Sequence, residues 1–243
     1  MDCELLELTS CCLSVGERAG LEGAMLQVAN AEGLKLRFWG RIFGDTADYL
    51  IAVSDEKKLN RKFYYTTSHK PEKLSQMAEA KEAEFAPFSG DPSTIQEDPE
   101  FREEHRLAFA VQKIDFDSNI APAGAWLVDA SRQVVPNASY QGLSHEAALN
   151  LKSYFHSREP RSSSAKNATT KMGLVRATEF LDPIADDMPK GVFALSLTPD
   201  ATAVTLRSLY WPGAVFVHKI NTRNYGSFYF GDGLPNSDLA FML

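Results

Sequence analysis

Two stretches with helical periodicity open the chain. Leu5, Leu8 and Cys12 recur at the spacing of one helix face, and residues 17–33 repeat the pattern. Each stripe is apolar on one side only, so each helix must pack against another part of the protein. The pattern therefore predicts a short N-terminal helical segment over residues 1–31.

The period of the apolar positions changes to two after residue 33. Leu36, Phe38 and Ile42 fall on one face of an extended chain, whereas Arg37 and Arg41 fall on the other. This alternation is typical of a half-buried β-strand. Turn residues then separate further apolar runs, which predict strands over residues 48–53, 62–68, 191–197, 203–211, 214–219 and 227–231.

The middle of the chain combines several signals. Residues 71–83 are rich in Glu, Lys, Ala and Met and predict a helix, whereas residues 86–100 carry the Pro, Gly, Asp and Ser of a long loop. Apolar side chains in residues 106–117 and 125–130 predict two more strands. Ser144 suits the N-cap of a helix, which we expect to extend to Glu159.

These elements predict an α+β fold, in which an antiparallel β-sheet packs against a few α-helices, including the N-terminal ones. Residues 160–172 are poor in apolar side chains and rich in Ser, Thr and Lys, which predicts a flexible linker. The length of 243 residues suits one generous domain over residues 1–243.

The composition narrows the possible functions. Hydrophobic residues make up 44% of the chain and charged residues 23%, as in ordinary globular proteins. A net charge of -7 argues against nucleic acid, because phosphate backbones bind basic surfaces. No apolar run approaches the ~20 residues that cross a bilayer, and the acidic N-terminus does not fit a secretory signal. We therefore expect a soluble cytoplasmic protein that binds neither nucleic acid nor a membrane.

Residue types that bind metals or catalyse reactions are scattered. None of the five histidines has a second His or Cys at i+3 or i+4, and no phosphate-binding, dinucleotide-binding, metalloprotease or nucleophile-elbow motif occurs. Asp115 and Asp117 alternate along a predicted strand as an acid–base pair would, but solvated carboxylates are the favoured interpretation. Residues 232–238 favour a turn over a calcium site. We predict no catalytic residue, no metal site and no cofactor.

Aromatic residues are concentrated near the predicted strands. Trp39 shares its alternate face with Arg37 and Arg41, so it is either an exposed interface anchor or covered by a helix, and the pattern favours neither. Trp211 and Tyr225 belong to an aromatic cluster in the last third, most of which we expect in the core.

The chain ends on three apolar residues, where charged and small polar residues are usual. They are Phe241, Met242 and Leu243. Something must cover them, so the tail either docks on this protein's own sheet or is offered to a partner.

Four long stretches resemble the radial spoke head protein 9 family, and they follow the family's order along the chain. They are FWGRIFGDTADYLIA (residues 38–52), SYFHSREP (153–160), LRSLYWPGAVFVH (206–218) and NYGSFYFGDGLPNSDLAFML (224–243), with shorter similarities at GDPS (90–93) and MPKG (188–191). Residues 63–86 and 161–170 do not match the family pattern.

The resemblance implies a non-catalytic structural subunit of the radial spoke head in the axoneme of motile cilia and flagella. It implies assembly with radial spoke head proteins of types 4 and 6 and with a spoke stalk scaffold of radial spoke protein 3 type. Central pair projections are a further implied contact, and the implied role is to relay mechanical signals between the central pair and the dynein arms. The residues carried over as interaction or framework candidates are Trp39, Arg41, Trp211, Tyr225, Phe241, Met242 and Leu243.

A rival hypothesis comes from a different class of protein. A chain of this size has room for a pocket between helix and sheet, which would suit an orphan hydrolase or a small-ligand-binding protein. A deep cavity with convergent histidine and carboxylate groups would favour that rival, whereas an apolar patch would favour assembly.

Overall fold

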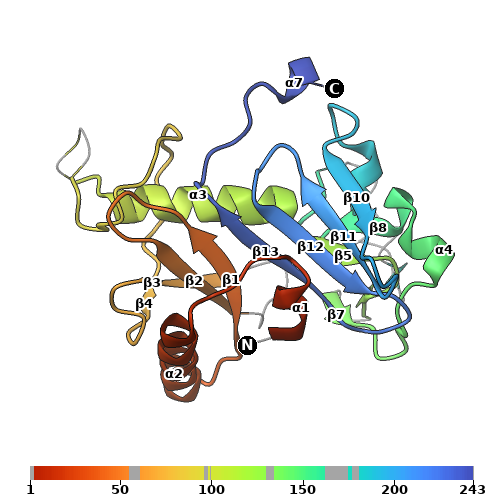
Figure 1. Cartoon of the computed structure of the whole chain (residues 1–243), viewed down its shortest axis with the longest axis horizontal. Helices are drawn as coiled ribbons and strands as arrows, with labels where there is room; N and C mark the ends of the chain where they lie inside the picture. The colour runs from red at the N-terminus through yellow and green to blue at the C-terminus, as the bar shows by residue number, and fades with distance from the viewer. Residues whose placement is uncertain are drawn as a thin grey trace.

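The computed structural model describes residues 3–54, 61–95, 98, 100–129, 134–161, 175–176 and 181–242. Its centre is an eight-stranded sheet in the order β10-β11-β12-β13-β1-β2-β3-β4 (Figure 1). The strands are β1 (Leu36–Ile42), β2 (Tyr49–Ser54), β3 (Lys62–Thr67), β4 (Ser75–Gln76), β10 (Phe193–Leu197), β11 (Ala203–Ser208), β12 (Ala214–Lys219) and β13 (Tyr225–Gly231). Helices pack on this sheet, so the predicted α+β class is confirmed.

The sheet joins two antiparallel halves, one from each end of the chain. Strands β1 to β4 form the first half and β10 to β13 the second, and they meet where β1 runs parallel to β13. Gly40 lies at this junction opposite Tyr229, and a Cβ on Gly40 would stand 2.2 Å from the Tyr229 carbonyl oxygen. Only glycine allows the two backbones to approach so closely.

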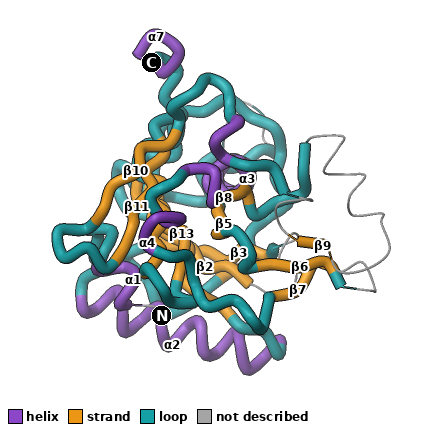
Figure 2. The backbone as a smooth tube through the Cα atoms, turned by 90° about the vertical axis from the view of Figure 1, so that its right-hand side faces the viewer, coloured by secondary structure: helices purple, strands orange, loops and turns teal. Residues whose placement is uncertain are grey.

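Helices cover both faces of the sheet around the junction of its two halves. On one face, α1 (Cys3–Glu7) and α2 (Val15–Glu32) confirm the predicted N-terminal helices, and Leu21 and Met25 of α2 pack on Phe38 and Leu50. On the other face lies α3 (Glu103–Ser118), as Figures 1 and 2 show. Burial of these apolar side chains is the main force that holds the layers together.

Smaller elements cover the second half of the sheet. Around Tyr154 and Phe216, an apolar cluster forms between the sheet and short segments that follow α3. These segments are β5 (Ile120–Pro122), α4 (His145–Ala148), the 3-10 turn η1 (Leu151–Ser153), β8 (Tyr154–His156) and the 3-10 turn η2 (Ile184–Asp186). A separate three-stranded sheet consists of β6 (Trp126–Val128), β7 (Val134–Pro136) and β9 (Val175–Arg176). Helix α7 (Leu239–Met242) ends the chain and stands apart from the body (Figures 1 and 2).

The alternation predicted for β1 holds only as far as Phe38. The register between β1 and β2 shifts between Phe38 and Gly40, which is a β-bulge at Trp39. An extra residue in one strand turns the following side chains to the opposite faces. Ile42 therefore packs on the α3 side with Trp39, and Arg41 faces α2. The prediction that Trp39 and Arg41 share a face is wrong for this reason.

The strand predicted over residues 106–117 is wrong, because this segment lies in helix α3. Its buried side chains Leu107, Ala110, Val111 and Ile114 follow the i, i+3, i+4, i+7 spacing of a helix face. Asp115 and Asp117, expected on a strand, are therefore helical.

Two predicted helices are also wrong in whole or in part. Residues 71–83 form no helix, and their only regular element is β4, which pairs with β3. The segment has helix-forming residues, but Leu74 packs on the cluster beneath α2 and Met77 on the cluster beneath α3, so its apolar side chains serve opposite faces of the sheet. Propensity alone is a weak determinant of structure. The helix predicted from Ser144 to Glu159 lasts only from His145 to Ala148, because Tyr154–His156 pairs with β5 as strand β8.

The other predicted strands are present in the structure. The predicted strands over residues 48–53, 62–68, 125–130, 191–197, 203–211, 214–219 and 227–231 correspond to β2, β3, β6, β10, β11, β12 and β13. Most of the predicted linker, residues 162–172, lies outside the described residues, and the single-domain division stays a prediction. In the described part of the chain no helix has both the length and the apolar character to span a membrane.

Candidate functional site

Helix α3 accepts a hydrogen bond from each of the two candidate tryptophans, Trp39 and Trp211. The Trp39 Nε1–H donates to Asp115 Oδ1 at 3.0 Å, and the Trp211 Nε1–H donates to Asp117 Oδ2 at 3.2 Å. Trp39 is only 3% exposed, so the helix-covered alternative is the one that the structure adopts. A buried indole needs a partner for its N–H, and the two carboxylates of α3 supply it. Both tryptophans are buried within the isolated chain.

Asp115 also joins α3 to the end of the first half of the sheet. The Arg61 guanidinium donates to both carboxylate oxygens of Asp115, at 2.8 and 2.6 Å, and to the Ser157 carbonyl at 3.2 Å. Both bonds to Asp115 come from Arg61 Nη1, and Nη2 makes the bond to Ser157, so one charge-assisted contact joins three elements. No sequence pattern predicts this pairing, because Arg61 and Asp115 are 54 residues apart.

Arg41 connects helix α2 to the sheet. Its guanidinium contacts Glu17 at 2.6 Å and Asp48 at 3.3 Å. Glu17 also accepts from Ser14, the N-cap residue of α2. Partial burial opposes ionisation of Glu17, but the hydrogen bonds from Ser14 and Arg41 prevail and lower its pKa below the usual value. Arg41 therefore orients the first turn of α2.

Glu103 is a buried carboxylate that the sequence did not single out. It is 1% exposed, and it accepts from Tyr49 Oη at 2.7 Å and from the Arg106 guanidinium at 3.3 Å. It also accepts from the backbone N–H of Ser89 at 3.0 Å and of Gly90 at 2.9 Å. Burial, together with the charge of Glu103, raises the pKa of Tyr49 well above its usual value. Glu103 thus fixes the loop that contains the GDPS motif.

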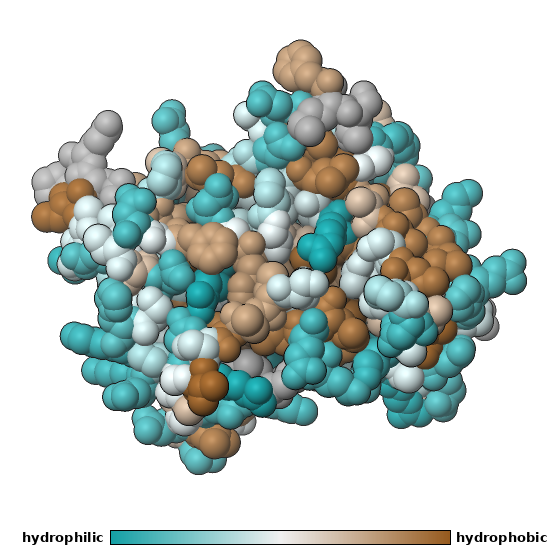
Figure 3. Space-filling view, in the orientation of Figure 1, coloured by the Kyte–Doolittle hydropathy of each residue, from teal (hydrophilic) through white to brown (hydrophobic). Residues whose placement is uncertain are grey.

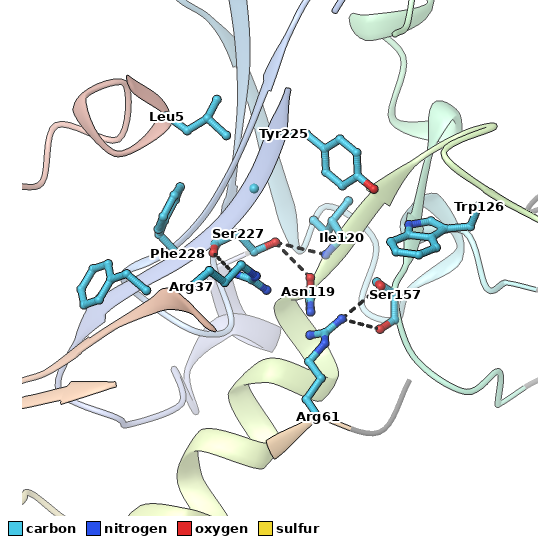
Figure 4. Close-up of a pocket in the computed structure, with 12 residues that line it drawn as sticks. Leu5, Arg37, Arg61, Asn119, Ile120, Trp126, Ser157, Tyr225, Ser227 and Phe228 are labelled. Carbon is cyan, nitrogen blue, oxygen red and sulfur yellow. Dashed lines mark hydrogen bonds between the residues drawn. The ribbon is translucent and has the colours of Figure 1, made fainter. Parts of the chain in front are cut away.

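Tyr225 lines a cavity of about 160 Å³ between the two halves of the sheet (Figure 4). Its ring packs edge-on against Tyr140, at 6.4 Å between centroids. In Figure 4 the Ser227 hydroxyl donates to the Asn119 side chain at 3.3 Å, and Leu5 and Phe228 lie on the apolar side. The polar atoms bond to one another across the wall of the cavity, which makes it a junction between elements.

A second cavity bears on the hydrolase hypothesis. It measures about 440 Å³ and includes His156, whose Nε2 lies 2.9 Å from Asp187. Ser208 also lines this cavity, but its Oγ accepts from the Trp211 backbone N–H at 3.1 Å. Within the described residues no hydrogen bond joins Ser208 to His156. A serine nucleophile needs a base within hydrogen-bond reach, so this geometry does not favour the rival. Over the same residues, no group of three His, Cys, Asp or Glu is placed to hold a metal.

The C-terminal tail is partly anchored and partly free. The Asn236 backbone N–H donates to the Tyr210 carbonyl at 2.7 Å, and Leu239 is buried at the second cavity. Phe241 is 90% exposed, and helix α7 projects from the body (Figure 1). The Met242 side chain and Leu243 lie outside the described residues. The tail therefore docks through Leu239 and presents Phe241 to the surroundings.

A buried histidine makes the stability of the chain dependent on pH. His218 is fully buried, its Nε2 lies 3.2 Å from Tyr140 Oη, and burial lowers its pKa to about 4. An unfolded chain regains a histidine pKa of about 6.5 and takes up a proton first. We expect the free energy of unfolding to fall by roughly 2 kcal/mol as the pH drops from about 6.5 to 4.

Urea unfolding at several pH values measures this effect. His218→Gln removes the titration and should flatten the pH dependence over that range, whereas His69→Gln, which replaces an exposed histidine, should leave it unchanged. Equal profiles for His218→Gln and the wild type would contradict the assignment.

Comparison with known proteins identifies the family. A radial spoke head protein 9 homolog from Danio rerio is 36% identical over 258 aligned positions, which cover 95% of this chain and 93% of the relative. Those from Bos taurus and Homo sapiens are each 34% identical, covering 95% and 86% of this chain and 93% and 85% of the relatives. No family model matches the sequence. Because the similarity extends over most of this chain and most of each relative, the chain belongs to the radial spoke head protein 9 family.

Proposed function

We propose that this chain is a structural component of the radial spoke head in the axoneme of cilia and flagella. The observation that carries the proposal is its similarity to radial spoke head protein 9 homologs from several vertebrates over most of their length. The hydrogen bonds from Ser227 to Asn119 in the first cavity and from Trp211 to Ser208 in the second hold parts of the fold together, which suits a role by assembly.

The mechanical part of the proposal is that the chain transmits force between its neighbours. The hydrogen bond from Trp39 to α3, the Arg41 contacts of α2 and the buried Glu103 of α3 each tie a covering helix to the same sheet. A surface that is already ordered loses little conformational entropy on docking. Such a body can relay contact between the central pair and the dynein arms with little internal deformation.

The C-terminal tail is the proposed docking element for other spoke subunits. Phe241 is exposed at the tip of a tail whose base is fixed by Leu239 and Asn236. Large aromatic side chains that enter an apolar pocket are frequent anchors of interfaces. The partners that we propose for this tail are radial spoke head proteins of types 4 and 6, with the stalk scaffold of radial spoke protein 3 type and central pair projections as further neighbours of the chain.

Replacement of Phe241 tests the docking role of the tail. In ciliated cells that lack their own radial spoke head protein 9, Phe241→Ser should reduce the amount of this chain in isolated axonemes by about tenfold, because the anchor is lost. The matched control is Phe43→Ser, which replaces a half-exposed phenylalanine on another part of the surface.

Two results would count against the proposal. If Phe241→Ser enters axonemes as well as the wild type, the tail is not the docking element. If the wild-type chain itself fails to enter axonemes, the assignment to the spoke head is wrong. Circular dichroism of the purified variants separates loss of docking from loss of folding, and we expect Phe241→Ser to unfold like the wild type because its side chain is exposed.

A further inference from the structure

Strand β10 forms an open edge of the eight-stranded sheet. Two hydrogen bonds flank the pairing of β10 with β11. Leu209 N–H donates to the Val192 carbonyl at one end, and Thr198 N–H donates to the Ala203 carbonyl at the other. Hydrogen-bonded pairs alternate along an antiparallel ladder, so residues 194 and 196 turn their backbone groups toward β11. The backbone groups of Phe193, Leu195 and Leu197 therefore point outward, and no strand pairs with them among the residues that the structure describes.

The β10 edge lacks the features that usually prevent strands from pairing between molecules. Its sequence, FALSL, contains no charge, no proline and no bulge. The opposite edge of the sheet differs, because β4 is only two residues long, Ser75–Gln76, and a two-residue strand offers little to pair with. The β4 edge is thus protected from pairing with another molecule, whereas the β10 edge is available for it.

Apolar side chains lie beside the open edge. Leu195 and Phe193 pack on the apolar cluster beneath the second half of the sheet, and Leu197 is partly exposed. Leu149, at the end of α4, is exposed next to Leu151, which packs on the same cluster. Figure 3 shows hydrophobic side chains gathered over α4 and near β10, on the right-hand side of the molecule. A strand added to β10 would cover part of this surface.

We propose that β10 pairs with β10 of a second copy of this chain, antiparallel and centred on Leu195. This register places Phe193 opposite Leu197 of the second copy, Leu195 opposite its counterpart, and Ala194 opposite Ser196. Large apolar residues meet each other and small residues meet each other, so the strand is complementary to itself. The outward backbone groups of residues 193, 195 and 197 become three hydrogen-bonded pairs in this register.

The second copy is favoured over other occupants by this self-complementarity. A twofold arrangement uses the same patch on both molecules, so a strand that matches itself residue by residue closes into a dimer. The interface does not rest on the proposed function, because it uses only the register and the open edge. Each copy carries a net charge of -7, so the two copies repel at low salt and the dimer should tighten as salt rises.

Sedimentation velocity of the full chain over a series of concentrations tests the pairing. The wild type should show a monomer–dimer equilibrium. Leu195→Lys and Leu195→Glu should each weaken the dimer by about tenfold or more, because two like charges then stand directly opposite each other. An equimolar mixture of the two variants should restore the dimer, because opposite charges meet in the register centred on residue 195.

The control is Leu26→Lys, which makes the same change at a leucine that is 64% exposed on α2 and remote from β10. It should dimerise like the wild type. A wild type that stays monomeric overturns the proposal, and so does a mixture of Leu195→Lys and Leu195→Glu that fails to dimerise although each variant folds. If Leu195→Lys instead loses a spoke head protein while the wild type is monomeric, the edge accepts a partner's strand and self-pairing is wrong.

Discussion

Glu103→Ala is expected to lower the free energy of unfolding by about 3–5 kcal/mol. The carboxylate is buried and accepts from Tyr49, Arg106 and the backbone of Ser89 and Gly90. Its removal takes the counter-charge from Arg106, which keeps only backbone carbonyl acceptors, and leaves the Tyr49 hydroxyl and the N–H groups of Ser89 and Gly90 without their acceptor. Each orphaned buried donor costs about 1–3 kcal/mol. Urea denaturation followed by circular dichroism gives the difference.

The neighbouring Glu104 provides the matched control for this prediction. It is partly exposed and accepts one hydrogen bond, from Tyr65 Oη at 3.2 Å. We expect Glu104→Ala to cost about 1 kcal/mol or less. Similar losses for the two variants would mean that the network around Glu103 does not hold the loop at Gly90. The loop requires glycine at position 90. The φ of Gly90 is +90°, and a Cβ at this position would stand 2.2 Å from the Ala47 carbonyl oxygen.

Trp39→Ala is expected to destabilise the chain by about 3–5 kcal/mol, because a large buried ring is replaced by a cavity. The ring packs on Phe63 and Tyr229, at 6.2 and 5.5 Å between centroids, and its N–H is bonded to Asp115. Thermal and urea unfolding both report the loss, and a lower midpoint with an unchanged urea slope indicates reduced stability of the same fold.

Phe43→Ala is the control for the tryptophan. Phe43 follows β1 directly and is 45% exposed, so its truncation should cost about 1 kcal/mol or less. If Trp39→Ala is as stable as Phe43→Ala, helix α3 does not depend on this ring, and Trp39 is no framework residue.

The sequence predicted the parts of the fold that depend on local pattern. The N-terminal helices followed from their apolar stripes, and the C-terminal strands from short apolar runs between turns. Helix α3 was misread because its twelve central residues are rich in β-compatible apolar and aromatic side chains, while the helical spacing from Leu107 to Ile114 is the pattern that decides. Residues 71–83 show the converse, since their composition favours a helix but the packing of Leu74 and Met77 on opposite faces of the sheet requires an extended chain.

The candidate site was less accessible from sequence, because most of its contacts join distant residues. The bulge at Trp39 turns the side chains that follow it to the opposite faces of β1, and its sequence signal is Gly40, the next residue, which the alternation pattern did not take into account. Glu103 is one of several acidic residues in its stretch, and only the fold shows that it alone is buried among Tyr49 and the backbone of the loop. The apolar composition of the tail indicated a docking element. Only the structure shows that Leu239 is buried in this chain and Phe241 is exposed.

The parallel contact between β1 and β13 has a consequence for biosynthesis. Gly40 and Tyr229 are neighbours in the sheet but are separated by 229 − 40 = 189 residues. A ribosome must therefore finish nearly the whole polypeptide before the two halves can meet, and until then the β1 side of the first hairpin stays unpaired. Chains with such long-range contacts fold slowly and expose strand edges while they wait. We therefore expect nascent chains of this protein to need protection of the β1 edge from aggregation during translation.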